Sequence, residues 1–132
     1  RTPSSAASDV YKRQRKDFDD HNDDIYERGI YSVYSDLRAT IERAIEEHFF
    51  RGTVIRHQDY ISLISLKKVT AMTLDHCERL QKLFKRCCDI TSAHDRSSLR
   101  SFGVPTPDDA LDDLAELRNL VDDVKGKQKL IS

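Results

Sequence analysis

The residues of this chain best suited to chemistry are an arginine, a glutamate and a histidine. Arg43 and Glu47 stand four positions apart, which places both side chains on one face of an α-helix. A guanidinium can hold a scissile phosphate, and a carboxylate one turn away can take the proton of a ribose 2′-hydroxyl. His94, beside Asp95 in a polar stretch, carries an imidazole that acts as acid or base near pH 7. These residue types together suit metal-independent cleavage of RNA.

Each of these residues also has an ordinary structural interpretation. Arg43 and Glu47 would form an exposed ion pair on a helix surface, worth roughly 0.3–0.5 kcal/mol. His94 would be an exposed loop histidine or a contact to a helix end. His48 directly follows Glu47 but falls on the core side of a straight helix, where a packed histidine is the simpler interpretation.

The cysteines do not predict a metal site. Cys87 and Cys88 are adjacent, so on a helix their side chains point about 100° apart and do not easily share one ion. Cys77 and His76 lack the spacing of zinc ligands relative to this pair. We therefore expect no bound metal and interpret Cys77 and Cys87 as small core residues. An odd cysteine count with an adjacent pair also indicates a reducing compartment.

The composition limits the partners of the chain. With 132 residues it is long enough for one domain, and its net charge of −1 supplies no overall field that would attract nucleic acid or a membrane surface. No apolar run approaches the roughly 18 residues of a membrane-spanning helix, and no signal peptide is visible. We expect a cytoplasmic chain with no membrane partner.

The element that must position Arg43 and Glu47 is a helix over residues 30–50. Its apolar residues recur in steps of four and three, which predicts one buried stripe. Gly52 is placed to end this helix. Residues 53–55 are β-branched and read as a brief extended segment. The predicted stripe consists of Ile30, Tyr34, Leu37, Ile41, Ile45 and Phe49, with His48 near its centre.

Two further helices are expected. One is capped by Thr73 and ends near Asp89; the last starts with Thr106 and Pro107 and ends at Gly126. Their apolar stripes are His76, Cys77, Leu80, Leu83, Phe84 and Cys87 in the first, and Leu111, Leu114, Leu117, Val121 and Val124 in the last.

Two connecting segments are less regular. Residues 60–69 read either as a second helix or as an extended run into a short helix. Residues 91–106 form the longest stretch without periodicity and contain Arg96 and Arg100 beside His94. The predicted fold is all-α: a small helical bundle of three to four main helices with a long loop before the last one.

The first residues have a separate origin in this interpretation. Residues 4–14 read SSAASDVYKRQ and resemble, over eleven consecutive residues, the in-frame translation of a transposase sequencing adapter. We therefore assign residues 1–14 to an adapter-derived segment, 15–29 to a charged linker or helix end, 30–125 to the helical domain and 126–132 to a basic tail. The natural protein would then extend upstream of Arg15, and this chain would be its C-terminal piece.

Four blocks of the chain, taken in order, resemble a known group of proteins. LRATIERAIEEHFF, GTVIRH, CCDITSAHDRSS and PTPDDALDDLAELRNLV resemble the C-terminal region of bacterial AAA/ABC-type ATPases with long coiled coils. Those ATPases are relatives of the tRNA anticodon nucleases of phage-defence systems. The resemblance covers residues 26–124. It implies that ATP would bind in an upstream ATPase region, since no GxxxxGK[ST] occurs here and no cofactor is expected in this fragment.

The resemblance also implies roles for individual residues. Anticodon nucleases carry a helical nuclease domain of the HEPN class, with Arg-x4-6-His or with Arg-x3-Glu and a distant histidine. Arg43 and Glu47 match Arg-x3-Glu, Arg43 and His48 match Arg-x4-His, and His94 takes the place of the distant histidine. Ala44 departs from the pattern, which has a polar residue there.

Two hypotheses follow for the function. In the first, the chain is the effector end of a defence-type ATPase and cuts RNA, with Arg43 binding phosphate, Glu47 and His94 as acid and base, and Arg96 and Arg100 binding substrate. In the second, it is a non-catalytic helical module that packs on the ATPase region or forms a homodimer. A basic groove around Arg43 and Arg96 would favour the first. An apolar patch flanking Phe50, with Arg43 and Glu47 splayed apart, would favour the second.

Overall fold

The computed structural model describes residues 3–19, 23–95 and 104–131, and these form helices joined by short irregular segments. The all-α prediction is confirmed. In chain order the helices are α1 (Pro3–Asp19), α2 (Asp23–Ala44), the π-helix η1 (Ile45–Phe49), α3 (Leu66–Val69), α4 (Leu74–Asp95) and α6 (Pro107–Gln128).

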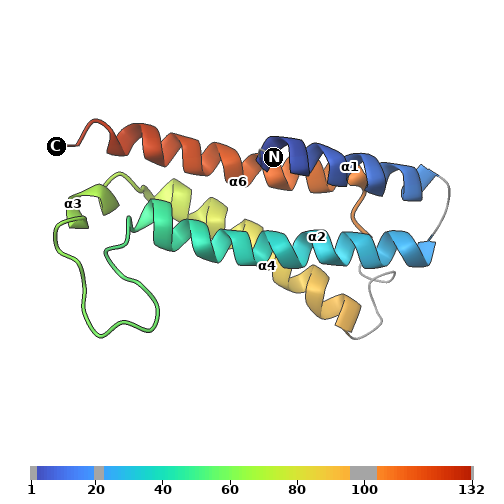
Figure 1. Ribbon diagram of the computed structural model, residues 1–132, viewed down its shortest axis with the longest axis horizontal. Helices are drawn as coiled ribbons and strands as arrows, with labels where there is room; N and C mark the ends of the chain where they lie inside the picture. The colour runs from blue at the N-terminus through green and yellow to red at the C-terminus, as the bar shows by residue number, and fades with distance from the viewer. Residues whose placement is uncertain (1–2, 20–22, 96–103, 132) are drawn as a thin grey trace.

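α2 is the helix against which the others pack. It contacts α1, α4 and α6, and η1 continues it at its C-terminal end (Figure 1). α4 runs antiparallel to α2, whereas α6 runs in the same direction and lies beside α1 (Figure 1). One end of the bundle therefore holds η1, α3 and the start of α4, and the other holds the start of α2 and the end of α4.

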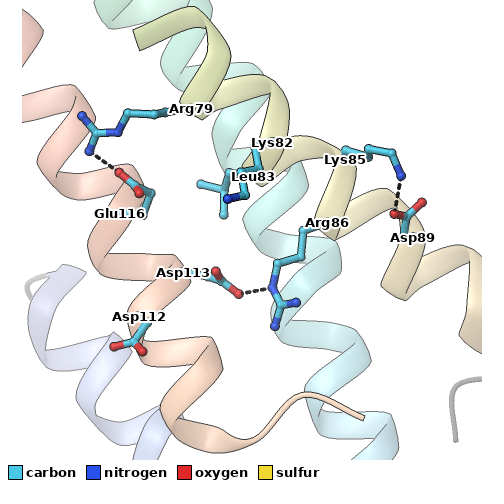
Figure 2. Close-up of a pocket in the computed structure, with 9 residues that line it drawn as sticks. All are labelled: Arg79, Lys82, Leu83, Lys85, Arg86, Asp89, Asp112, Asp113 and Glu116. Carbon is cyan, nitrogen blue, oxygen red and sulfur yellow. Dashed lines mark hydrogen bonds and ion pairs between the residues drawn. The ribbon is translucent and has the colours of Figure 1, made fainter. Parts of the chain in front are cut away.

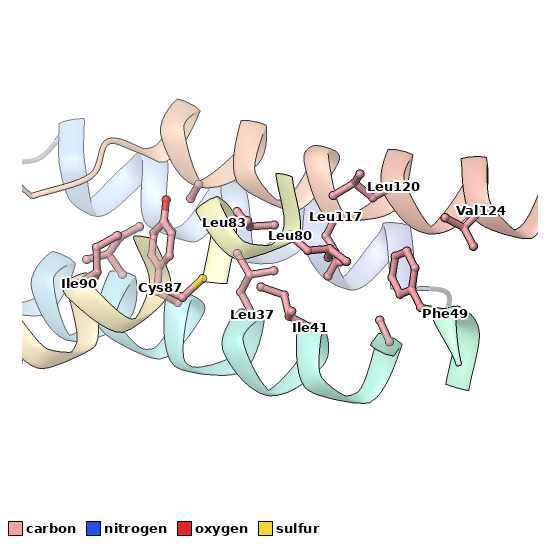
Figure 3. Packing of buried hydrophobic residues seen from close by; sticks show 14 of the residues in the cluster. Leu37, Ile41, Phe49, Leu80, Leu83, Cys87, Ile90, Leu117, Leu120 and Val124 are labelled. Carbon is pink, nitrogen blue, oxygen red and sulfur yellow. The ribbon is translucent and has the colours of Figure 1, made fainter. Parts of the chain in front are cut away.

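The core contains most of the predicted stripes of α2 and α4. Ile30, Tyr34, Leu37 and Ile41 are all buried on α2, as predicted. Leu37 and Ile41 face the buried side chains of α4 (Figure 3). The steps of four and three keep these side chains on one face, so α2 buries a continuous apolar strip. The buried partners from the other helices are Leu80, Leu83, Cys87 and Ile90 on α4 and Ala110, Leu117, Leu120 and Val124 on α6.

The predicted α-helical register fails at the C-terminal end of the central helix. Ala44 and Phe49 are both buried, and they stand five residues apart rather than three or four. A π-helix over Ile45–Phe49 absorbs the additional residue, and the Phe50 amide donates to the Ile45 carbonyl at 2.8 Å. The wider turn buries Phe49 and leaves His48 and Ile45 only partly buried. His48 is therefore not at the centre of the buried stripe.

The connection after η1 returns the chain to α4. Gly52, at φ 72°, and Arg51, at φ 50°, end the helical backbone, and the Gly52 amide donates to the Glu46 carbonyl at 2.9 Å. An isolated bridge between Val54 and Ile61 follows. The structure thus has an irregular run into the short helix α3 rather than a second full helix. The connection extends away from the bundle at this end (Figure 1).

α4 is longer than predicted. It continues past Asp89 to Asp95, so residues 91–95 are helical instead of part of a loop. Ile90 and Thr91 are buried, and the Thr91 hydroxyl donates to the Cys87 carbonyl one turn earlier at 3.0 Å. This bond satisfies the polar Thr91 side chain inside the helix. The predicted helix ended too early because residues 91–95 show no apolar periodicity.

α6 begins as predicted. Thr106 accepts from the Asp109 amide at 3.1 Å, the Thr106 amide donates to the Asp109 carboxylate at 2.9 Å, and Pro107 occupies the first turn. The predicted end at Gly126 is wrong, because the helix runs on to Gln128, which is buried. The Gln128 amide donates to the His48 carbonyl at 2.6 Å and so ties the end of α6 to η1.

The buried face of α6 is also turned from the predicted one. Leu111 is exposed, Leu114 and Val121 are partly buried, and Leu120 is fully buried although it was not in the predicted stripe. Ala110 is buried as well. The helix contacts α1, α2 and α4 at once, so its apolar face is broader than a single stripe.

The residues before the predicted domain belong to the bundle. Residues 23–29 are the first turns of α2, and the buried Tyr26 donates its hydroxyl to the Pro105 carbonyl. α1 packs against α2 and α6, and Tyr11 donates to Asp108 at 2.9 Å. Residues 3–14 are therefore part of the packed bundle, while their adapter origin stays a prediction.

α1 nevertheless adds little apolar burial. Gln14 is the one buried side chain among those described in this helix, and its Oε1 has no hydrogen-bond partner there. Its amide lies against Gly29 of α2, where a Cβ would overlap it. The absent side chain of Gly29 is what lets the two helices approach at this point.

Gly29→Ala tests the docking of α1. In a chain lacking residues 1–14, alanine should raise the free energy of unfolding by about 0.5–1 kcal/mol, because glycine is a poor helix former. In the full chain the Gln14 amide must move away, so we expect that gain to be lost. Urea denaturation of the full and the truncated chain, each with and without Gly29→Ala, measures the coupling free energy between residue 29 and residues 1–14. An equal gain in both backgrounds would show that α1 does not cover Gly29 in solution.

Candidate docking groove between α2 and α4

The structure does not bring the predicted catalytic residues together within one chain. Arg43 and Glu47 are both exposed, and within the described part of the chain no ion pair joins them. His94 lies in the last turn of α4, and its side chain is outside the described residues. Arg96 and Arg100, the predicted substrate-binding residues, also lie outside them.

Two arginine–aromatic contacts between α2 and α4 show which residues of the two helices lie side by side along the bundle axis. The Arg38 guanidinium lies 5.6 Å from the centre of the Phe84 ring, and the Arg86 guanidinium lies 5.7 Å from that of Tyr34. Arg43 is one turn beyond Arg38 in one direction, and the last turn of α4 continues in the other. At 1.5 Å per residue, the backbones of Arg43 and the end of α4 are about 20 Å apart along the bundle.

The charges next to Arg43 are mixed rather than basic. Arg56, from the connection after η1, pairs with Glu42 at 2.9 Å and with Glu46. The hydrogen bond to Glu46 is the main cause that raises the pKa of the Arg56 guanidinium. Glu47 is close by in the sequence and exposed. This arrangement offers no concentration of positive charge to a phosphodiester backbone.

An apolar groove lies between α2 and α4. It encloses about 390 Å³, and its lining is formed mainly by Ile41, Ile45, Leu80 and Phe84. Glu42, Gln81 and Lys85 stand at its edge. Ile41 and Leu80 are buried at its base, whereas Ile45 and Phe84 are only partly covered. The groove thus presents apolar side chains that no other part of the described chain fills.

A second hollow of about 220 Å³ continues this groove toward the end of the bundle. It is lined by Ile45, Phe50 and Val54, together with the three members of the Arg56 ion-pair cluster. Glu42 and Ile45 line both spaces, so the two are neighbours along η1. We call the combined surface, formed by Ile41, Glu42, Ile45, Glu46, Phe50, Val54, Arg56, Leu80, Gln81, Phe84 and Lys85, the α2–α4 groove.

A larger hollow between α4 and α6 has a different character. It encloses about 530 Å³ and is lined by four basic and four acidic side chains around Leu83 (Figure 2). Arg86 pairs with Asp113 at 2.7 Å, and Arg79 pairs with Glu116 (Figure 2). These ion pairs cross from α4 to α6, and the opposing charges cancel. The ion pairs of this hollow therefore hold the two helices together, and the hollow has little electrostatic attraction for a polyanion.

The polar network behind this hollow is structural. Asp113 also accepts from the hydroxyl of Tyr34, whose pKa is raised chiefly by burial. One carboxylate thus links a residue of α2, a residue of α4 and its own helix α6. Such a network satisfies a polar group that would otherwise be buried without a partner.

The remaining titratable residues also have structural roles. His76 is buried: its Nδ1 accepts from the Thr73 amide at 2.9 Å, and its Nε2 lies 2.5 Å from Asp123. This pairing caps α4, since the Thr73 hydroxyl in turn lies 3.3 Å from the His76 amide. Burial raises the pKa of Cys87 to about 12, which keeps its thiol protonated and unreactive. Cys87 is thus the core residue predicted, whereas Cys77 is only partly buried.

The described residues show neither a metal-binding cluster nor a membrane-spanning helix. They contain no group of three or more His, Cys, Asp or Glu side chains placed to hold a metal ion. None of the helices that the structure describes combines the length and the apolar character needed to cross a bilayer.

Comparison with protein families, with curated proteins and with solved structures found no match to this chain. The resemblance to ATPase-linked nucleases therefore stays a prediction from the sequence.

Sequence reasoning missed the groove because it assigned the lining residues to the core. Ile45 and Phe84 both stand in predicted buried stripes, yet both are partly uncovered. A signal was present: Ala44 and Ile45 are adjacent apolar residues, and only one of them can lie at the centre of a stripe. The reach of Arg56 to Glu42 and Glu46 depends on the path of an irregular connection, which residue spacing does not encode.

Proposed function

We propose that this chain is a non-catalytic helical interaction module that receives an apolar segment in the α2–α4 groove. The observation that carries the proposal is the partly uncovered apolar lining of Ile45, Phe50 and Phe84 beside charged residues at the edge. Apolar floors with a few polar groups at the edge are typical of sites that bind amphipathic helices or apolar loops.

Arg43 and Glu47, which form no ion pair in the described part of the chain, support the same proposal. An apolar patch flanking Phe50, with this pair apart, is the arrangement expected of an interaction module. RNA cleavage by Arg43, Glu47 and His94 would need groups from opposite ends of the bundle, so a second chain would have to supply the histidine. No observation in the described residues favours that route. A place at the end of an ATPase stays a proposal, and recovering the upstream reading frame with a phosphate-binding loop would support it.

The proposal is tested with displayed amphipathic helical peptides selected on the purified chain. Selected peptides should bind the parent and lose at least about tenfold in affinity to Ile45→Glu, which puts a charge in the groove. Arg43→Glu, on the exposed side of the same helix, is the matched control and should leave binding unchanged. Equal binding to the parent and Ile45→Glu would contradict the proposal. Cleavage of RNA that Arg43→Ala abolishes would replace it with the catalytic hypothesis.

A further inference from the structure

The connection between η1 and α3 exposes an unusual amount of apolar surface. Ile64 is 95 % exposed and Leu63 72 %, and Tyr60 and Ile61 are also mostly in contact with solvent. Val54, Ile55 and Leu66 are exposed in the same connection. We call residues 54–66 the apolar loop. It extends away from the helices at one end of the bundle (Figure 1), so the helices that the structure describes leave it largely uncovered.

The exposed area is large for a surface without a partner. Burying one side chain of this size removes roughly 60–120 Å² from water, so seven partly exposed ones present on the order of 500 Å². The largest apolar patch on a typical monomer is about 300–600 Å² and is often functional. Isolated exposed apolar residues need no explanation, but a cluster of this size in one connection does.

The apolar loop and the α2–α4 groove complement each other. The groove has an incompletely filled apolar floor, and the loop has apolar side chains that are largely exposed to solvent. Charge adds little to this match, because residues 54–66 carry one Arg and one Asp, and Glu42 and Glu46 border the groove. Arg56, at the base of the loop, already pairs with both glutamates in its own chain.

We infer that the occupant of the groove is the apolar loop of a second copy of this chain, in a two-fold dimer. This inference rests on the proposed function and names its partner. A two-fold interface requires that one surface carry both a projecting part and its complement, and this end of the bundle carries both. Each copy would bury its loop and its groove together. The roughly 500 Å² of the loop, with the floor of the groove added, approaches the roughly 600 Å² that each partner buries in the smaller stable interfaces.

Two positive-φ residues mark where the loop can change direction. Arg51, at φ 50°, and His57, at φ 67°, adopt a conformation that costs a residue with a Cβ about 1 kcal/mol. Both stand near Arg56, so the loop is joined to the helices through a short segment with left-handed turns.

Sedimentation equilibrium over a concentration series tests the dimer. The parent chain should dimerise, and Ile64→Glu should weaken the dimer by at least about a hundredfold, because the two-fold dimer loses two buried apolar side chains, one from each copy. Ile25→Glu is the matched control: Ile25 is also exposed, at 57 %, but lies on α2 at the opposite end. A monomeric parent at hundreds of micromolar, or equal weakening by Ile25→Glu, would overturn the inference.

Complementation tests that the loop enters the groove rather than pairing with another loop. Ile64→Glu keeps an intact groove and Ile45→Glu keeps an intact loop, so neither should dimerise alone, yet their mixture should form a heterodimer. Gln81→Trp, an exposed edge position, replaces Ile45→Glu if that variant loses helical content. Dimerisation of the groove variant alone, or no heterodimer in the mixture, would overturn the inference. A monomeric parent that still binds selected peptides would remove the second copy and leave the proposed function standing.

Discussion

Leu37→Ala and Ile41→Ala should each lower the free energy of unfolding by about 2–5 kcal/mol. Leu37 is 2 % exposed and Ile41 is fully buried, and both lie where α2 meets α4 (Figure 3). Truncation there removes apolar contacts and leaves a cavity that close-packed neighbours fill only in part. Urea denaturation followed by circular dichroism measures the loss.

Arg43→Ala is the matched control on the same helix. Arg43 is exposed and has no ion pair with Glu47, so its removal should cost less than about 1 kcal/mol. A large cost for Arg43→Ala with a small one for Leu37→Ala would mean that α2 presents its other face to the core. The residues assigned to the groove would then not lie between α2 and α4, and the proposed function would be contradicted.

Sequence periodicity was sufficient for the parts of the fold that follow regular helical geometry. The stripe from Ile30 to Ile41 and the cap at Thr106 and Pro107 appear in the structure as predicted. Each depends on residues within one or two turns, where spacing alone decides which side chains share a face. The same reasoning failed for Leu111, because α6 contacts three helices and its buried face is set by their arrangement.

The candidate site was less predictable for a related reason. Arg43 and Glu47 were correctly placed on an exposed face, but their distance from the end of α4 depends on how far two antiparallel helices run past each other. That offset is a tertiary property. The apolar loop was visible in the sequence as Ile61, Leu63 and Ile64, yet such a run is equally typical of a buried segment. Only the fold shows that these side chains remain uncovered.

The π-helix has a cause that residue types explain. In a regular α-helix the residue four positions after Ala44 would face the core, and that residue is His48. Phe49 follows it, and burying an aromatic ring contributes about 1.5–3 kcal/mol more than leaving it exposed. One additional residue in the turn buries Phe49 and lets His48 move toward the surface. Burial of Phe49 in place of His48 offsets the unfavourable backbone geometry of the π-helix.

Deletion of Glu47 should therefore be tolerated, whereas deletion of Ala39 should abolish the fold. Without Glu47 the spacing from Ala44 to Phe49 becomes four, so a regular α-helix buries Phe49 and the chain should remain within about 1–2 kcal/mol of the parent. Without Ala39 every later residue of α2 turns by about 100°, which moves Ile41 away from α4. Both deleted residues are exposed, so neither deletion removes a core contact directly.

Circular dichroism and urea denaturation of the two deletions give the comparison. We expect a cooperative transition for the Glu47 deletion and none for the Ala39 deletion, because only the latter puts the stripe out of register. Loss of the transition in both would show that the five-residue spacing is needed for the fold and that Phe49 cannot enter the core from an α-helical turn. A cooperative transition in both would contradict the burial of Ile41, since its position on the helix would then not matter.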